Sequence, residues 1–284
     1  MSKIIISAFA DEYATELCEQ INGMRKLGIS NIEIRGVDGE NISVISEDKI
    51  ALVKEALDKN GISVSAVGSP IGKIKIDGDI EAHFEMAERI FNTANILGAK
   101  YVRMFSFYRS QQCSAEEYKK SVYSYLERLL TLAEKYGVIL CHENEEAIYG
   151  ESPDACLELL EYFNGRLKAV FDMGNFVLGG YDPVLAYDKL KSYVAYFHIK
   201  DAKDGEIVVP GEGNGSIGAI LGAHVEGSQE PFFATLEPHL MDFVGLGALN
   251  ENASEHQSVR FSSNSAAFSC AAEALEKIVN EVIK

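Results

Sequence analysis

Short β-type runs alternate with longer helical patterns along the whole chain, and this alternation restricts the possible folds more than any other feature. Eight runs begin near Ile4, Ile32, Ile62, Tyr101, Val138, Lys168, Val194 and Phe233. Their starts lie 26 to 39 residues apart, which leaves room for one helix in each interval. Strands that alternate with helices form parallel sheets. The count of eight favours an α/β fold in which the sheet closes on itself, a (β/α)8 TIM barrel, over an open doubly wound sheet.

Residue choices at the expected helix ends support these boundaries. Ser114-Ala-Glu-Glu117 matches a capping box, in which the serine oxygen and the glutamate carboxylate satisfy free amides at a helix start. Ser152-Pro153 and Asp182-Pro183 each place a capping residue before a proline in the first helical turn. Glycines suited to ending a helix precede three expected strands, and they are Gly28, Gly98 and Gly137. The last helix is expected from about Ser265 to Ile283.

The chain is expected to form a single domain over residues 1–284. A barrel of about 250 residues is ordinarily one domain, and the sequence shows no low-complexity tract or linker that would divide it. Two segments, Lys200 to Glu230 and Met241 to Ser263, are long for plain connections. Both follow late strands, where long loops of a barrel commonly carry function.

The charge balance restricts the class of partner. The chain carries 26 Lys and Arg against 43 Asp and Glu, a formal net charge of −17. Such a surface repels phosphate backbones and anionic membranes, so we expect a small-molecule partner and neither nucleic acid nor membrane. No apolar stretch approaches the roughly 18 residues that span a bilayer.

The cysteines and the N-terminal segment bear on the compartment. Five cysteines occur without a C-x-x-C pair, which argues against a disulfide framework or a zinc knuckle. The short apolar run from Ile4 to Ala10 is followed at once by acidic residues and lacks a basic leader, so we interpret it as a strand and not as a signal peptide. We therefore expect a reducing, cytoplasmic location. A homo-oligomer is compatible with such a barrel, although the sequence does not specify one.

Four consecutive expected strands end in a residue that can bind a metal ion. These residues are Glu143, Asp172, His198 and Glu237. The carboxyl ends of barrel strands meet at one face, where active sites lie. Three carboxylates buried together disfavour each other's ionised form, and a divalent cation removes that cost. Oxygen-rich ligation with one imidazole suits Mn²⁺ best, with Zn²⁺, Co²⁺ or Mg²⁺ as alternatives. The competing interpretation is four unrelated polar residues, some of them in salt bridges.

Strand alternation adds a test of this arrangement. Side chains along a strand point to opposite faces in turn, so Glu143 shares a face with Cys141, and His198 shares one with Tyr196. If the ligands point inward, these neighbours fill the barrel interior. His142 then lies on the outer face, where we expect a structural role under a helix rather than metal binding.

Five short segments carry a resemblance to a known family. They are His142-Glu-Asn-Glu145, Phe171-Asp-Met-Gly-Asn175, Phe197-His-Ile-Lys-Asp201, Pro210-Gly-Glu-Gly213 and Leu236-Glu237. Together they resemble the sugar phosphate isomerase/epimerase family of xylose isomerase-like barrels, and the similarity begins at Ser7-Ala-Phe-Ala-Asp-Glu12. The resemblance implies a divalent metal held by the four strand-end residues. It also implies that Glu143 and Glu237 act as acid and base in the isomerisation or epimerisation of a small sugar or sugar phosphate.

One position departs from the family pattern, and the reaction stays open. Many members have a histidine three residues after the aspartate, where it contacts substrate; here that position is Asn175, which can donate a hydrogen bond but cannot shuttle protons. A metal-dependent lyase (dehydratase) acting on a sugar-derived keto acid, and a non-catalytic sugar-binding barrel, are the alternatives. A DNA-repair endonuclease is disfavoured by the acidic charge and because, of six histidines, only His198 clearly ends a strand.

Further residues are candidates for substrate contact. Arg103 and Phe105 lie at the expected end of the fourth strand, Tyr101–Ser106. Lys200 could neutralise an oxyanion or a phosphate, or form a salt bridge, and Tyr149 could close over substrate or pack. The remaining candidates are Asn175 and Glu212.

The glycine-rich segment that contains Glu212 matches G-x-G-x-x-G through Gly213, Gly215 and Gly218. The match lies late in the chain, after a short β-type run at Ile207–Val209, and not in an opening βαβ unit, so a dinucleotide site is disfavoured. A flexible loop over the metal is favoured, and phosphate contact after the seventh strand is also open.

Overall fold

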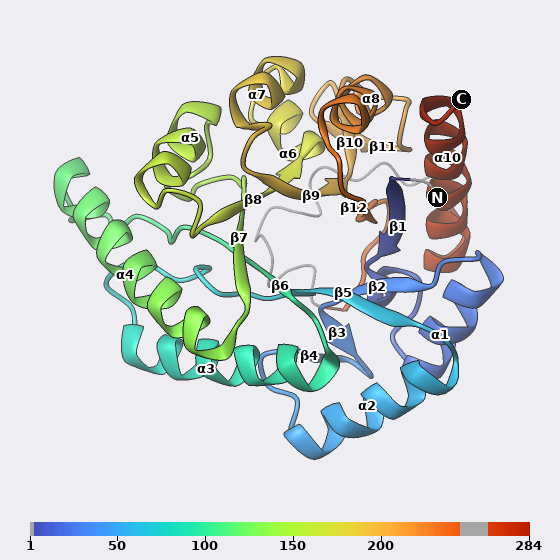
Figure 1. Cartoon of the computed structure of the whole chain (residues 1–284), viewed down its shortest axis with the longest axis horizontal. Coiled ribbons are helices and arrows are strands. Elements are labelled where there is room, and N and C mark those ends of the chain that lie inside the picture. Colours follow the sequence, from blue (N-terminus) through green and yellow to red (C-terminus); the bar gives the residue numbers. More distant parts are fainter. Residues whose placement is uncertain (1–2, 245–260) are drawn as a thin grey trace.

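The computed structural model, which describes residues 3–244 and 261–284, shows eight parallel strands in a nearly closed barrel with helices around it (Figure 1). The hydrogen-bonded order is β1-β12-β9-β8-β7-β6-β5-β2. The barrel strands are β1 (Ile4–Ala8), β2 (Asn31–Ile34), β5 (Ser63–Gly68), β6 (Tyr101–Met104), β7 (Ile139–Glu143), β8 (Lys168–Asp172), β9 (Val194–Ile199) and β12 (Phe232–Leu236). Each lies at one of the eight predicted runs, and the predicted (β/α)8 barrel is confirmed.

The helices lie outside the strands and begin and end close to the predicted signals (Figure 1). The α-helices are α1 (Leu17–Lys26), α2 (Glu47–Lys59), α3 (Ile80–Leu97), α4 (Ala115–Tyr136), α5 (Pro153–Tyr162), α6 (Met173–Leu178), α7 (Pro183–Leu190), α8 (Ile217–Gly227) and α10 (Asn264–Val282). The capping box is present before α4: the Glu117 amide donates to Ser114 Oγ, and the Ser114 amide donates to the Glu117 carboxylate. Gly98 and Gly137 end α3 and α4 in the left-handed conformation, with φ of 75° and 69°.

Two layers of buried side chains follow the predicted strand alternation. Cys141, Val170 and Tyr196 form, with Ala66, a cluster that is separate from the larger core between strands and helices. Phe171 belongs to that larger core. His142, on the same outer face, is 2% exposed, and its Nε2 lies 2.9 Å from Ser106 Oγ. These contacts support the structural role expected for His142.

The structure differs from the prediction in the loops at the carboxyl ends of the strands. The fourth strand, β6, ends at Met104 and not at Ser106, because the Phe105 amide leaves the sheet and donates to Ile71 of the preceding loop. A short hairpin of β3 (Gly36–Val37) and β4 (Glu40–Asn41) follows β2 and was not expected from the sequence. Its strands of two residues are too short to show a periodic pattern.

A second hairpin and a partly described segment occupy the two long regions. β10 (Asp201–Lys203) and β11 (Glu206–Val208) pair within the Lys200–Glu230 segment. Of the segment from Met241 to Ser263, residues 245–260 lie outside the described residues. Among the helices of the described ranges, none has the length and apolar character needed to cross a bilayer.

Replacing Ser114 with alanine removes one half of the capping box at the start of α4. We expect a loss of about 1 kcal/mol in the free energy of unfolding, the usual effect of losing such a cap. Ser124→Ala, at an exposed position inside the same helix, should change it by no more than about 0.5 kcal/mol. Urea denaturation of both variants measures this. Equal effects would show that the capping box contributes nothing.

Candidate metal centre

The barrel brings together the four residues predicted to hold a metal. Glu143 and Asp172 are the last residues of β7 and β8, His198 lies one residue before the end of β9, and Glu237 follows β12 directly. One ligand-capable atom from each of the four lies within 4.8 Å of those of the others. All four side chains are buried. Parallel strands whose carboxyl ends meet on one face produce this convergence.

His198 lies between three carboxylates. Its Nδ1 is 3.0 Å from Glu143 Oε1 and 3.1 Å from Glu237 Oε2, and its Nε2 is 3.0 Å from Glu33 Oε2. Burial would lower the pKa of His198, but these carboxylates outweigh it and raise the pKa well above its usual value. The imidazole is therefore a cation when a proton occupies Nδ1, and a metal ion would take the place of that proton.

Glu33 is a functional candidate that the sequence analysis missed. It lies inside β2, is 1% exposed, and also accepts a hydrogen bond from the Tyr196 hydroxyl at 3.0 Å. A carboxylate on the far nitrogen of a metal-binding histidine fixes its tautomer and orientation and raises its basicity. The available signal was a single acid in the apolar run Asn31–Ile34, on the face that strand alternation assigns to the interior.

Each of the three candidate carboxylate ligands has a cation of its own. Arg103 Nη1 lies 3.1 Å from Glu143 Oε2, and Lys200 Nζ lies 3.1 Å from Asp172 Oδ2. Arg35 Nη1 lies 2.9 Å from Glu237 Oε1. The salt bridge considered for Lys200 is thus present, and Arg103, predicted as a substrate contact, lies directly beside a candidate ligand.

The pKa values of the three carboxyl groups differ because their surroundings differ. Burial opposes ionisation of Glu143, but His198 and Arg103 outweigh it and lower the pKa to about 2. Burial likewise opposes ionisation of Glu237, yet Lys200 and His198 hold its pKa well below the usual range. For Asp172 burial prevails over the attraction of Lys200, and the pKa rises to about 7. Both glutamates are therefore ionised at neutral pH.

Unsatisfied oxygens test whether these residues fit a cation. Glu143 Oε2, Asp172 Oδ2 and Glu237 Oε2 are buried and accept no hydrogen bond from any described residue. Each lies 3.1 Å from a cationic nitrogen, of Arg103, Lys200 and His198 in turn, but none of these contacts has the geometry of a hydrogen bond. Three such oxygens beside one imidazole nitrogen match the oxygen-rich donor set of a divalent metal. The four residues fit a metal ion by this observation.

A second group of ligand-capable atoms lies next to the first. Glu12, Glu237 and His239 also offer atoms within 4.8 Å of one another. However, Arg35 Nη2 lies 3.1 Å from Glu12 Oε1, and its Nη1 contacts Glu237. The guanidinium already provides the positive charge for this group, so it gives no reason to expect a second metal.

The other predicted substrate contacts divide into two sets. Asn175 Nδ2 points at the centre, 3.4 Å from Glu143 Oε1, and donates to the Asn144 carbonyl at 2.9 Å. The Phe105 ring is fully buried, with the Arg103 guanidinium 4.5 Å from its centroid. Tyr149 instead lies against α4 and α5, where its hydroxyl donates to Glu158 at 2.9 Å. Its contacts favour the packing role that the sequence left open.

The glycine-rich loop after β11 folds around an internal carboxylate. Amides of Gly211, Gly213 and Gly215 donate to the two Asp201 oxygens at 2.8, 3.0 and 2.8 Å. A Cβ on Gly213 would lie 2.3 Å from Asp201 Oδ1, so this close approach requires glycine. Glu212 is exposed and lies near α10, where it contributes, after burial, to raising the pKa of Cys270.

The likeness to known proteins agrees with this geometry. Residues 22–223 match the family model described as a xylose isomerase-like TIM barrel. The chain belongs to this family. The match confirms the resemblance seen in the short sequence segments. No curated protein matches the chain significantly.

Solved structures of this barrel class cover nearly the whole chain. D-Allulose 3-epimerase from Methylomonas sp., in complex with D-allulose, aligns over 99% of this chain and 98% of its own at 15% identity and a TM-score of 0.77. A xylose isomerase-like protein from Mycobacterium smegmatis in complex with magnesium aligns over 99% and 97% at 16% identity and a TM-score of 0.71.

A third solved structure has a different activity. The probable 3-DHS dehydratase of petrobactin synthesis from Bacillus anthracis aligns over 88% of this chain and 97% of its own at 17% identity and a TM-score of 0.69. At such identities the likeness shows the fold. Sugar epimerases and a probable dehydratase share that fold.

Replacing Glu33 with glutamine tests whether the carboxylate behind His198 supports metal binding. We expect Mn²⁺ affinity, measured by isothermal titration calorimetry, to fall about 10- to 100-fold, as is typical when such a partner is lost. Tyr196→Phe keeps the carboxylate and removes only its second hydrogen bond, so it should cause a smaller loss. Unchanged affinity in a folded Glu33→Gln protein would contradict this role.

Proposed function

We propose that this protein is a divalent-metal-dependent isomerase or epimerase of a small sugar, in which Glu143 and Glu237 move a proton through an enediolate. The proposal is carried by the convergence on one imidazole, at the carboxyl-terminal face of the barrel, of three carboxylate oxygens that accept no hydrogen bond from a described residue. A divalent cation held by Glu143, Asp172, His198 and Glu237 would act as the Lewis acid that stabilises charge on the sugar oxygens.

The two glutamates are placed for acid and base work. Glu143 comes from β7 and Glu237 from the end of β12, with His198 between them. Both are ionised, as a base must be, and each is held by its own arginine. One glutamate, as the carboxylate, would remove the proton from carbon and become the neutral acid. For epimerisation the other would deliver to the opposite face a proton that it has first taken up from solvent, and exchange with solvent would restore both groups. Return to the neighbouring carbon would give isomerisation.

The remaining polar groups orient these carboxylates. Arg35 fixes Glu237 through Oε1 and leaves Oε2 on the side of His198. Asn175 lies next to Glu143 at the position where many relatives carry histidine. An amide there can hold Glu143 or a substrate oxygen, but it cannot carry a proton. In this proposal, therefore, Asn175 takes no part in proton transfer, which is left to the two glutamates and solvent.

A metal-dependent dehydratase is the nearest alternative, because one similar structure is a probable dehydratase. It would use the same base and would also need an acid to expel water. Formation of an absorbing enone would distinguish it from epimerisation. Tight sugar binding without turnover would instead indicate a non-catalytic sugar-binding barrel.

Several companion proposals go with this function. We propose Mn²⁺ as the preferred ion, because three carboxylates and one imidazole leave two positions of an octahedral shell for water or substrate oxygens. The partner would be a small sugar, with no role for nucleic acid or membrane. We also propose a cytoplasmic location, in keeping with the five free cysteines, four of which are buried or half-buried. The proposed assembly is a homo-oligomer.

Replacing either catalytic candidate tests the mechanism. Glu237→Gln and Glu143→Gln should each lower kcat about 10²- to 10⁴-fold, the usual contribution of a positioned acid or base. Deuterium uptake from D2O into a panel of ketoses, followed by NMR on metal-loaded protein, measures the step directly. Metal content must be determined for each variant.

Glu116→Gln, an exposed change on α4 that also removes one carboxylate, serves as the matched control and should leave turnover unchanged. A Glu237→Gln protein that binds metal and exchanges deuterium at the normal rate would remove this glutamate from the mechanism.

A further inference from the structure

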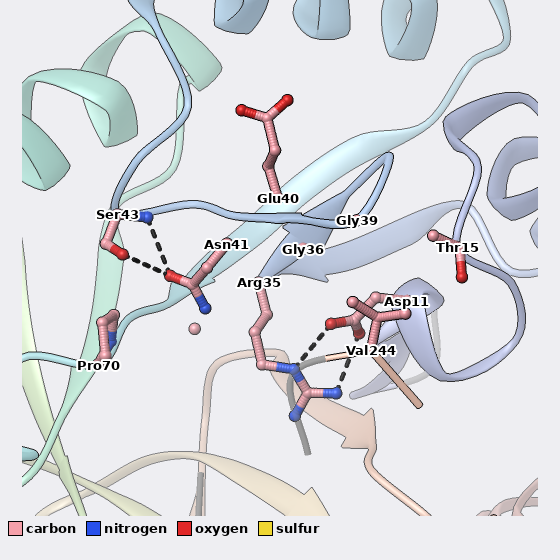
Figure 2. A pocket seen from close by; sticks show the side chains of 11 residues that line it. Asp11, Thr15, Arg35, Gly36, Gly39, Glu40, Asn41, Ser43, Pro70 and Val244 are labelled. Atoms are coloured by element: carbon pink, nitrogen blue, oxygen red, sulfur yellow. Dashed lines mark hydrogen bonds and ion pairs between the residues drawn. The ribbon is translucent and has the colours of Figure 1, made fainter. Parts of the chain in front are cut away.

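A pocket opens beside the candidate metal centre, at the carboxyl ends of β1, β2 and β5. It has a volume of about 240 Å³, and Figure 2 shows Arg35 and Asp11 at one end with the β3–β4 hairpin along its side. The polar side chains that line it are those of Asp11, Thr15, Arg35, Glu40, Asn41 and Ser43. Ligand pockets usually enclose about 300–1,000 Å³, so this one is suited to one end of a ligand.

The pocket adjoins both catalytic candidates. Arg35 lines it and is bonded to Glu237 at 2.9 Å. Gly68 also lines it, and a Cβ on this glycine would lie 3.1 Å from Arg103 Nη2, on the arginine that contacts Glu143. A ligand whose reacting carbons lie at the metal centre could therefore extend its far end into this pocket.

The positive charge of Arg35, the cation in the pocket, is already offset by neighbouring acidic side chains. Arg35 makes a two-point pair with Asp11, Nε to Oδ2 at 2.9 Å and Nη2 to Oδ1 at 3.0 Å (Figure 2). It also contacts Glu12 and Glu237. A phosphate ester carries roughly −1.5 to −2 charges near neutral pH. It would have to displace these carboxylates or lie beside Asp11, and either arrangement is unfavourable.

Arg103 offers hydrogen-bond donors without spare charge. It is 1% exposed, and its Nε and Nη2 find no hydrogen-bond acceptor among the described residues. Its charge faces Glu143 at 3.1 Å. Such a group can donate to a hydroxyl or carbonyl oxygen of a neutral sugar, whereas a phosphate would compete with the catalytic carboxylate for it.

The usual phosphate position of a barrel is also occupied from within. Barrels frequently bind phosphate with the loops that follow their last strands. Here the glycine amides after β11 donate to Asp201, and Lys200 pairs with Asp172 at 3.1 Å. The Asp201 carboxylate thus already accepts from the loop amides that could otherwise bind an anion.

The remaining pocket groups suit sugar hydroxyls. The Asn41 side-chain oxygen accepts from the Ser43 amide at 3.0 Å and from its hydroxyl at 2.7 Å. Figure 2 shows the Asn41 amide nitrogen on the side away from Ser43. Asn41 thus presents a donor, and Asp11 and Thr15 add oxygen atoms that can accept from hydroxyl groups.

We propose that the substrate is an unphosphorylated sugar, and that the pocket lined by Asp11, Arg35 and Asn41 binds the hydroxyl groups of its non-reacting end. This inference rests on the proposed function and narrows its substrate class. It assigns the pocket a specificity role, because the carboxylates around Arg35 exclude a terminal phosphate.

Paired substrates test the inference. Metal-loaded protein is assayed with each ketohexose and with the same ketohexose phosphorylated at its terminal carbon. We expect kcat/KM to be at least about 100-fold higher for the free sugar, by analogy with other unfavourable buried charge contacts. Equal or preferred use of the phosphate ester overturns the inference and leaves the proposed function intact. Binding or turnover of neither member, with metal bound, overturns both.

A binding measurement gives a readout that does not depend on turnover. Thermal unfolding of the metal-free protein is followed with the free ketohexose or with inorganic phosphate as the probe. The midpoint should rise with the sugar and stay unchanged with phosphate. A rise with phosphate alone contradicts the inference.

Two substitutions test the pocket itself. Asp11→Asn removes one carboxylate from Arg35 and should narrow the preference for free sugar about tenfold, mainly through a lower KM for the ester. Asp58→Asn, an exposed change on α2 with the same loss of charge, is the matched control and should leave the preference unaltered. A folded Asp11→Asn protein with the control's preference overturns the charge argument.

Asn41→Asp keeps the oxygen that binds Ser43 but replaces the donor with a carboxylate oxygen. The KM for the free sugar should rise about 5- to 10-fold while kcat stays within twofold, since the reacting carbons lie elsewhere. An unchanged KM removes the pocket from the substrate site, whether or not Asp11→Asn folds.

Discussion

The burial of several carboxylates at one end of the barrel is the constraint on which the rest of the site depends. Glu143, Asp172 and Glu237 converge there, with Glu33 behind His198 and two more acids beside Arg35. Like charges in a low-dielectric interior disfavour each other's ionisation, so counter-charges must be supplied at short range. Three basic side chains and one imidazole supply part of this charge, and three carboxylate oxygens accept no hydrogen bond from the part of the chain that the structure describes.

The main effect of these buried ion pairs is to fix the orientation of the carboxylates. Desolvating two charges costs about as much as their attraction returns, so such pairs contribute little net stability. What they do provide is geometry: Arg35 directly follows β2 and Arg103 lies in β6, and the two guanidinium groups fix Glu237 and Glu143 respectively. A planar guanidinium suits this task better than an ammonium group, because it can bind several carboxylates in fixed directions at once.

The same charge pairing links the centre to its surroundings. Arg35 belongs both to the pocket and to the contacts of Glu237, so the group that orients this candidate catalytic carboxylate also sets the electrostatic character of the pocket. In the loop after β11, Asp201 takes up amides that would otherwise attract an anion. The protein thereby pairs these positive and dipolar groups internally, which is the basis for the proposed preference for a neutral sugar.

The sequence by itself determined the barrel, the eight strand positions and the set of four strand-end residues, because strand period, helix caps and the carboxyl-end rule are local or fold-wide regularities. It also placed Cys141 and Tyr196 inside and His142 outside, since alternation along a strand needs no knowledge of distant residues. Only the tertiary structure decided that Glu33 supports His198 and that Arg35 joins Asp11, Glu12 and Glu237. The same holds for the contact of the Tyr149 hydroxyl with Glu158 on α5, and for the contact of Asp201 with the amides of the glycine-rich loop. These contacts join residues whose separation along the chain carries no pattern, so they appear only when the closed barrel brings the strands together.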